Sequence, residues 1–147
     1  MPATHKIPIA CDHAAVEIKN KIISEFKTIH WDDLGTNNNS SVDYPDYAKL
    51  VAEKISNNQS ERGILICGSG IGMSIAANRY PHVRAALAYT PEAAKLSREH
   101  NDANVLCLSA RLVDDQTNIE IVEAWLNAEF SNEPRHQNRV RKIELKK

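Results

Sequence analysis

The chain has 147 residues, a formal net charge of −1 and aromatic residues at only 5% of its positions. This length suits one domain with a substantial core, and the near-neutral charge and scarce aromatic side chains disfavour a nucleic-acid partner. No apolar run approaches the roughly 20 residues that cross a bilayer, and the first six residues lack the apolar core of a signal peptide. We therefore expect neither a membrane nor a nucleic acid as partner.

Apolar strand segments alternate with helical segments along residues 1–130. In chain order, strands are predicted over 7–11, 28–34, 63–67, 83–88 and 104–109, and helices over 14–26, 44–55, 73–78, 91–99 and 114–130. Strands that alternate with helices of about a dozen residues form parallel βαβ units. The sequence thus predicts an α/β fold, a single-domain Rossmann-like three-layer sandwich with a five-stranded parallel sheet.

A basic tail, residues 131–147, follows the last helix of this domain and begins with a Ser-Asn-Glu-Pro break. Arg135 and Arg139 stand four residues apart in it, so in an extra C-terminal helix both guanidinium groups project from one face and can clamp a phosphate. A solvated basic helix end is the competing interpretation. Val140 and Ile143 form a small apolar stripe, which favours packing of the tail on a partner subunit.

Three cysteines, Cys11, Cys67 and Cys107, lie in or at the end of predicted strands. Their number is odd and none stands in a C-x-x-C pair, so neither a disulfide framework nor a cysteine metal site is predicted. A reduced, cytoplasmic protein is the simplest explanation.

Polar residues follow several of the predicted strands. Asp12 and His13 follow the first strand, Cys67 and Gly68 stand at the end of the third, and Arg111 follows the fifth. Parallel sheets of this type bind ligands beyond the carboxyl ends of their strands, so these positions form one candidate site. For Asp12, capping of the next helix is a strong alternative role.

A glycine loop, Gly68-Ser69-Gly70-Ile71-Gly72, follows Cys67 and precedes a predicted helix. Alternating glycines let the backbone turn tightly and point its N–H groups at a ligand. Such a loop at a helix N-terminus favours anions and lowers the pKa of a nearby thiol. It lacks both the G-x-G-x-x-G dinucleotide spacing and the Gly-Lys-Ser/Thr ending of a P-loop. Cys67 is therefore either a reactive thiol or a small buried apolar side chain, and its position alone does not decide.

His100, Asn101 and Asp102 are predicted to lie in the loop between the fourth helix and the fifth strand. A hydrolase triad of Cys67, His100 and an aspartate is conceivable, although the G-x-S-x-G elbow of such enzymes is missing. The chain has no H-E-x-x-H motif and no histidine cluster with ligand spacing, so no metal ion is predicted.

Together, these ordered motifs resemble those of ribose-5-phosphate isomerase type B and the related galactose- and allose-phosphate isomerases. The resemblance spans nearly the whole chain and is carried by Cys11-Asp12-His13, Asp43-Tyr44-Pro45, the run from Gly63 to Asn78, the run from Leu96 to Asp102, Asn104-Val105-Leu106, and Arg135-His136-Gln137-Asn138-Arg139. It implies a cofactor-free isomerase that interconverts D-ribose 5-phosphate and D-ribulose 5-phosphate in the non-oxidative branch of the pentose phosphate pathway.

The resemblance also implies roles for single residues. In this family the residue that matches Cys67 is the base that moves a proton between C1 and C2 through an enediolate, and Met73 stands where another branch has a glutamate base. Ser69 is implied to shuttle the hydroxyl proton and His100 to assist opening of the sugar ring. The remaining roles are contact of Asp12 and Asn101 with the sugar, of the backbone of Gly68, Gly70, Ile71 and Gly72 with the enediolate, and of His13, Arg111, Arg135 and Arg139 with the phosphate. These groups are expected to be shared between the subunits of a homodimer or a tetramer.

Two other functions remain open at this point. A six-carbon substrate such as allose 6-phosphate or galactose 6-phosphate needs its phosphate held farther from Cys67. A sugar-phosphate-binding module without turnover would bind its ligand and leave it unchanged, although mere binding requires no thiol beside the glycine loop.

Overall fold

A computed structural model of the protein describes residues 6–144, which form a five-stranded sheet and six helices. The strands are β1 (Ile7–Cys11), β2 (Trp31–Asp33), β3 (Gly63–Cys67), β4 (Ala85–Leu87) and β5 (Val105–Ser109), and the helices are α1 (Val16–Glu25), α2 (Tyr44–Ser56), α3 (Ile71–Ala77), α4 (Pro91–Asn101), α5 (Asp115–Asn127) and α6 (Pro134–Ile143). All strand pairs are parallel, in the order β2-β1-β3-β5-β4. The predicted Rossmann-like α/β sandwich with an extra C-terminal helix is confirmed.

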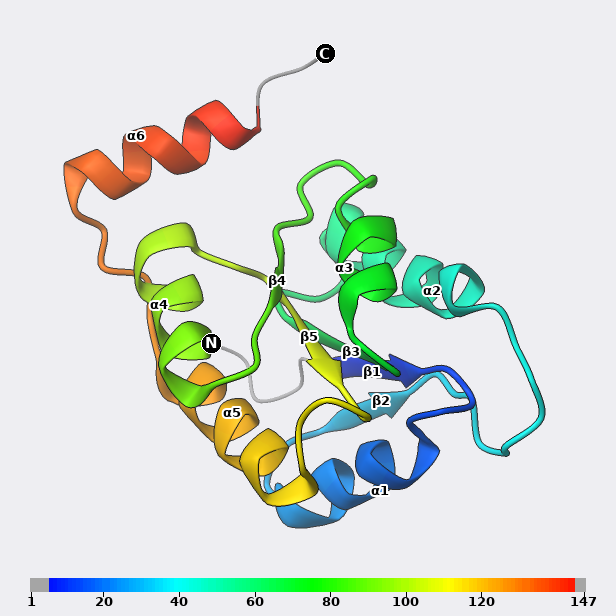
Figure 1. Cartoon of the computed structure of the whole chain (residues 1–147). Helices are drawn as coiled ribbons and strands as arrows, with labels where there is room; N and C mark the ends of the chain where they lie inside the picture. Colours follow the sequence, from blue (N-terminus) through cyan, green and yellow to red (C-terminus); the bar gives the residue numbers. More distant parts are fainter. Residues whose placement is uncertain (1–5, 145–147) are drawn as a thin grey trace.

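Helices cover both faces of the sheet, which gives the molecule three layers (Figure 1). On one face, Ile64 and Ile66 of β3 belong to a core cluster that includes side chains of α1, α4 and α5. On the other face, Leu65 and Cys67 belong to a second cluster with side chains of α2 and α3. Because β3 is covered on both sides, its residues are continuously apolar, as is typical of a central parallel strand.

The central strands end together at one edge of the sheet. Cys67 of β3 pairs with Ser109 of β5, and the N–H of Asp12 donates to the Ile66 carbonyl at 3.1 Å. The residues that follow β1, β3 and β5 therefore emerge side by side, and the predicted common edge is confirmed.

The two outer strands are shorter than predicted. β2 has three residues out of the predicted 28–34, and β4 has three out of the predicted 83–88. Each outer strand has a neighbour on one side only and is incompletely buried. Directly after each outer strand, one apolar residue still bonds to the neighbouring strand: Leu34 N–H donates to the Ile9 carbonyl at 2.9 Å and Ala88 N–H to the Cys107 carbonyl at 3.2 Å.

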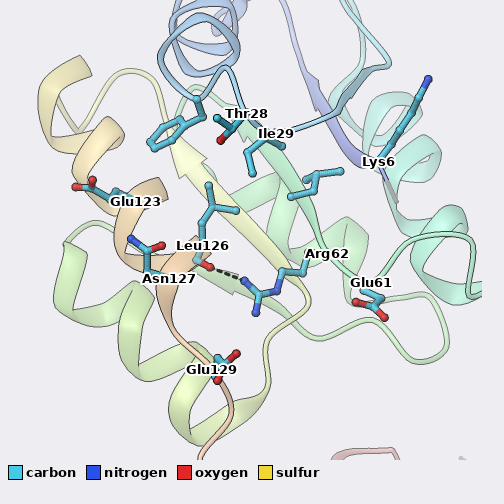
Figure 2. A pocket seen from close by; sticks show the side chains of 11 residues that line it. Lys6, Thr28, Ile29, Glu61, Arg62, Glu123, Leu126, Asn127 and Glu129 are labelled. Carbon is cyan, nitrogen blue, oxygen red and sulfur yellow. Dashed lines mark hydrogen bonds between the residues drawn. The ribbon is translucent and has the colours of Figure 1, made fainter. Parts of the chain in front are cut away.

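Helix α5 ends at Asn127, three residues before the predicted end. The guanidinium of Arg62 donates to three carbonyls there, those of Trp125, Leu126 and Ala128, at 3.4, 3.0 and 3.2 Å. It thereby satisfies carbonyls that a helix end leaves without partners. Figure 2 shows Arg62 and Leu126 beside a cavity of about 550 Å³, which contains none of the predicted site residues.

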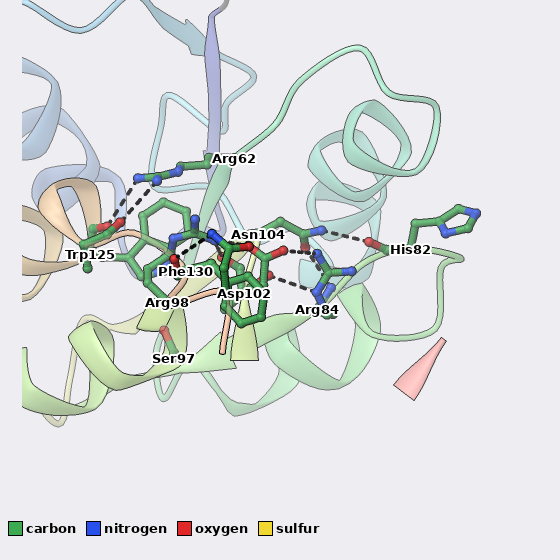
Figure 3. Close-up of polar contacts among 12 residues, drawn as sticks. Arg62, His82, Arg84, Ser97, Arg98, Asp102, Asn104, Trp125 and Phe130 are labelled. Carbon is green, nitrogen blue, oxygen red and sulfur yellow. Dashed lines mark hydrogen bonds and ion pairs between the residues drawn. The ribbon is translucent and has the colours of Figure 1, made fainter. Parts of the chain in front are cut away.

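Helix α4 includes His100 and Asn101, so the prediction that these residues lie in a loop is wrong. The helix ends at Asn101, and the φ of 48° at its C-cap residue, Asp102, is left-handed. Figure 3 shows why the helix extends this far: Arg98 donates to the Asp102 carboxylate at 2.9 Å, and Arg84 donates to the Asp102 carbonyl at 2.9 Å. These two arginines stabilise an extra half-turn.

Helix α6 lies apart from the sheet, beyond α4 (Figure 1). The ring of His136 packs against that of His100 in a tilted arrangement with 4.4 Å between centroids, and Glu144 at the end of α6 pairs with Arg84. The division of the chain at residue 130 stays a prediction. Within residues 6–144, every helix is too short or too polar to span a membrane.

Candidate active site

Cys67 lies at the carboxyl end of β3, on the face that α2 and α3 cover. Only 4% of the residue is exposed. Its sulfur accepts a hydrogen bond from the backbone N–H of Gly70 at 3.1 Å. A donated N–H stabilises negative charge on its acceptor, so this contact suits a sulfur that releases and takes up a proton.

Gly70 holds its place in the glycine loop only because it has no side chain. Its φ of +79° is left-handed. A Cβ atom there would lie 2.6 Å from Cδ1 of Leu87 and 2.9 Å from the carbonyl oxygen of Leu108. The glycine thus permits the tight turn that carries the chain from β3 into α3.

Ser69 is half-buried in the same loop. Its Oγ accepts the N–H of Ile71 at 3.2 Å, and its carbonyl accepts the hydroxyl of Tyr89 at 2.8 Å. Because Oγ is the acceptor in the first bond, its own hydrogen remains available to a bound molecule. Two loop amides that were expected to face an anion, those of Gly70 and Ile71, already donate within the loop.

A buried polar brace joins the glycine loop to β5. Ser109 Oγ donates to the Gly68 carbonyl at 2.7 Å, Asn118 Nδ2 donates to the Ser109 carbonyl at 2.9 Å, and both residues are fully buried. The N–H of Arg111 donates to the same Gly68 carbonyl at 2.9 Å, and its side chain lies so near that a Cβ on Gly68 would be 3.1 Å from Nη1. Sequence reasoning missed Ser109 and Asn118. The available signal for Ser109 was a polar residue ending a buried strand.

Asp12 and His13 form the turn after β1. The Asp12 carboxylate accepts the N–H of Ala14 at 3.0 Å, while the N-cap of α1 is Ala15, so the alternative that Asp12 caps this helix is wrong. His13 Nδ1 accepts the N–H of Val42 at 3.1 Å. In the neutral ring the proton must then be on Nε2. The neutral His13 ring thus keeps one donor, Nε2–H, besides its contact with Val42.

Tyr44, the first residue of α2, packs against Gly72 of the glycine loop. A Cβ atom on Gly72 would lie 2.6 Å from Cε1 and Cζ of its ring. Sequence reasoning noted Tyr44 as part of a motif and as a helix start without giving it a role. The available signal in the sequence was an aromatic residue at a predicted helix start. In the structure this side chain is 40% exposed beside the glycine loop.

Four residues that the resemblance assigns to the site do not join this group within one chain: His100, Asn101, Arg135 and Arg139. The end of α4 comes just before β5 begins at Val105, whereas Cys67 pairs with Ser109 at the other end of β5. Four strand steps of about 3.3 Å separate these ends by about 13 Å. The two arginines are exposed on α6, which packs beside the end of α4.

The other two cysteines differ from Cys67 in their surroundings. Burial raises the pKa of Cys11 to about 12, and burial also raises the pKa of Cys107. The Cys11 thiol donates to the Thr36 carbonyl at 3.6 Å, which requires its proton. Among the three, only the Cys67 sulfur accepts a backbone N–H within the described residues.

Known proteins share this arrangement of strands and motifs. The family described as Ribose/Galactose Isomerase matches residues 7–143. The chain belongs to the ribose/galactose isomerase family. Ribose-5-phosphate isomerase B of Escherichia coli is 41% identical over 140 residues, which cover 94% of this chain and 93% of that enzyme.

Solved structures of this isomerase family superpose closely on the chain. The ribose 5-phosphate isomerase of Thermotoga maritima has a TM-score of 0.91 and 48% identity, with 96% of this chain and 98% of that chain covered. Ribose-5-phosphate isomerase B of Mycoplasma genitalium, solved with bound ribulose-5-phosphate, has a TM-score of 0.91 and 45% identity, with coverages of 96% and 95%. The family resemblance and the enzyme class, an isomerase, are confirmed.

Proposed function

We propose that this protein interconverts D-ribose 5-phosphate and D-ribulose 5-phosphate, with Cys67 as the general base. Membership of the isomerase family and the ribulose 5-phosphate bound by the Mycoplasma genitalium relative support this substrate pair. The observation that carries the mechanism is the hydrogen bond from Gly70 N–H to the Cys67 sulfur. A cytoplasmic location and a place in the pentose phosphate pathway belong to the same proposal.

The reaction moves one proton between neighbouring carbons. The Cys67 thiolate removes the proton from C2 of the open-chain aldose, the electron pair forms a double bond between C1 and C2, and the C1 carbonyl oxygen becomes an enediolate oxygen. The protonated sulfur then returns the proton to C1, while Ser69 passes the hydroxyl proton from O2 to O1. The low exposure of Cys67 limits exchange of these protons with water.

The enediolate charge is stabilised by backbone donors beside the sulfur. The Gly70 and Ile71 N–H groups donate within the loop. The donors left for the enediolate are therefore the N–H groups of Gly72 and Met73 in the first turn of α3, which have no acceptors within their own helix. A single preorganised donor of this kind lowers a barrier by on the order of 3 kcal/mol. The Arg111 side chain over Gly68 adds a positive charge at the same edge of the sheet.

A complete site requires two copies of the chain. The base and the glycine loop lie at one edge of the sheet, whereas His100 and Asn101 lie at the other. A homodimer that brings the glycine loop of one chain against the α4–α6 end of its partner unites the base with the ring-opening histidine. It also brings Arg135 and Arg139 to the phosphate beside His13 and Arg111.

Exposed apolar side chains support this pairing. Ile71 of the glycine loop, Ile75 one turn farther along α3 and Leu112 next to Arg111 are 47%, 62% and 64% exposed. A hollow of about 930 Å³ lies between α6 and β4 and is lined in part by Asn101 and Ile143. Apolar patches of this kind mark protein–protein contacts, and association of two chains covers both surfaces.

The activity is tested by mixing the protein with ribose 5-phosphate and measuring ketose formation. Cys67→Ala is expected to abolish turnover and to keep the fold and phosphate binding, while Cys11→Ala, a buried thiol on the neighbouring strand, keeps kcat. Turnover by Cys67→Ala contradicts the assignment of the base. Binding without conversion by the parent protein identifies a binding module, and a higher kcat/KM for allose 6-phosphate identifies a six-carbon isomerase.

Sharing of the site is tested by subunit complementation. Cys67→Ala and His100→Asn each disable the conversion of ribose 5-phosphate when present alone. A mixed dimer of the two carries one doubly altered site and one intact site, so equal coexpression is expected to restore about a quarter of the parent activity by random pairing of subunits. An activity no higher than that of the separate variants contradicts the shared site.

A further inference from the structure

Lys19 of α1 is a buried charged side chain that the proposed reaction does not use. Its side chain is 0% exposed, and Nζ donates to Asp33 Oδ1 at 2.6 Å and to Asn37 Oδ1 at 2.8 Å. A buried ammonium is unfavourable unless such partners compensate it. Asp33 is the last residue of β2, and Asn37 lies in the chain segment that connects β2 to α2, so Lys19 joins the end of the strand to the first half of this connection.

The same connection, residues 34–43, contacts the candidate active site through Val42. At the start of the connection, the N–H of Gly35 donates to the carboxylate of Asp33, the last residue of β2, at 3.0 Å. Near its end, the N–H of Val42 donates to His13 Nδ1 at 3.1 Å. Lys19 therefore anchors the first half of a segment whose second half holds the ring of His13.

We propose that Lys19 is a positioning residue for phosphate binding. By fixing the 34–43 segment, its ammonium keeps the Val42 N–H on Nδ1 of His13 and so keeps the ring proton on Nε2, where it is donated to the phosphate. The inference rests on the proposed function, because contact of His13 with the phosphate is part of that function. When the segment is released, Nδ1 is free to carry the proton in part of the molecules, and Nε2 then has no hydrogen to donate.

The charge of Lys19 can be removed without leaving a buried partner unpaired. The Asp33 side chain is 35% exposed and Asn37 is exposed, so water can take the place of the ammonium at both acceptors. Methionine has an unbranched stem of similar length and adapts to irregular apolar space. Removal of one partner of an ion pair destabilises when the remaining charge is buried; here the remaining Asp33 carboxylate reaches water, and Lys19→Met is therefore expected to fold.

Lys21 on the same helix provides the matched control. Its side chain is 52% exposed and pairs with Asp115 at 2.6 Å, away from the 34–43 segment. Lys19→Met is expected to raise KM for ribose 5-phosphate about tenfold with kcat changed less than about threefold, as for loss of a phosphate contact. Lys21→Met is expected to leave both constants unchanged. An unchanged KM in Lys19→Met overturns the proposal.

Nuclear magnetic resonance distinguishes this local effect from a general loss of stability, because it reports on Val42 and on the His13 ring separately from the rest of the fold. In Lys19→Met, amide hydrogen exchange is expected to become faster at Val42 than in the parent but to stay the same in β3, and the ¹⁵N signals of the His13 ring are expected to show both tautomers. Parent-like exchange at Val42 together with parent-like His13 signals overturns the proposal. Asn37→Ala, at an exposed position, is the second variant and is expected to change the same signals in the same direction.

These spectra also separate this inference from the proposed function. They require no turnover, and inorganic phosphate replaces the sugar phosphate as ligand. If the parent protein does not convert ribose 5-phosphate, the proposed function fails. The role of Lys19 is still supported if Lys19→Met weakens phosphate binding about tenfold and changes the His13 signals, and it is overturned if neither changes.

Discussion

Gly70→Ala adds one methyl group at the tightest point of the glycine loop. The left-handed φ of +79° disfavours alanine by about 1–2 kcal/mol. The new Cβ would also lie 2.9 Å from the Leu108 carbonyl oxygen and 3.0 Å from its carbon, both backbone atoms of a central strand that cannot move aside. Overpacking of this kind destabilises by about 1–3 kcal/mol. The free energy of unfolding is therefore expected to fall by about 2–5 kcal/mol, a decrease in Tm of roughly 5–15 °C for a chain of this size.

Gly72→Ala is the matched control for this prediction. Its Cβ would meet the ring of Tyr44, a side chain that is 40% exposed and free to turn outward, and its φ is not left-handed. Urea unfolding is expected to show a loss below about 1.5 kcal/mol for Gly72→Ala. Because Gly70 also donates its N–H to the Cys67 sulfur, kcat is expected to fall in Gly70→Ala even below its Tm. Equal stability losses in the two variants would refute the reasoning.

Two further predictions follow from the charged tail and the buried thiols. Arg139→Ala is expected to raise KM for ribose 5-phosphate with little change in kcat, because phosphate contacts bind substrate and transition state alike; Lys142→Ala on the same helix is the control, and equal KM values in both contradict the clamp. The free energy of unfolding is expected to fall as pH rises above about 9, because Cys11 and Cys107 keep their protons in the native protein but lose them in the unfolded chain. Each thiol contributes a slope of up to about 1.4 kcal/mol per pH unit. Urea unfolding of Cys11→Ala between pH 8 and 11 is expected to show a shallower slope than the parent, and equal slopes contradict the assignment.

The central strands could be predicted from the sequence because burial on both faces makes them continuously apolar. β1 and β3 were predicted at their observed bounds, and the observed β5 begins at Val105, one residue after its predicted start. The outer strands were overpredicted, since apolar residues such as Val83 pack on the core outside any ladder. Apolar character reports burial, whereas strand bounds depend on neighbours that only the fold supplies.

The ends of α5 and α4 could not be predicted, because each depends on side-chain bonds of an arginine. Arg62 comes 63 residues before the Trp125 carbonyl that it caps, and no local signal at the end of α5 reveals it. For α4, the polar segment around Asp102 is typical of a loop, yet its bonds with Arg98 extend the helix. Long-range side-chain bonds to backbone carbonyls thus limit prediction of helix ends.

The sequence predicted the location of the candidate site, at the carboxyl edge of the sheet, but it did not predict the side-chain contacts within the site. Parallel topology places the residues after β1, β3 and β5 together, and the structure confirms this placement. The buried brace of Ser109 and Asn118 depends on side-chain geometry that spacing does not encode. The placement of His100 at the opposite end of the sheet also depends on the course of α4, and it separates residues that the motifs present as one group.

The three cysteines show most clearly what sequence position leaves undecided. Each ends or lies within a predicted strand, and each is buried in the structure. Cys11 donates its thiol hydrogen to the Thr36 carbonyl, whereas Cys67 accepts the N–H of Gly70. A thiol that donates is held in its protonated form, and a sulfur that accepts is compatible with negative charge. The direction of one hydrogen bond, set by the turn after each strand, therefore distinguishes the proposed base from a structural thiol of the same type.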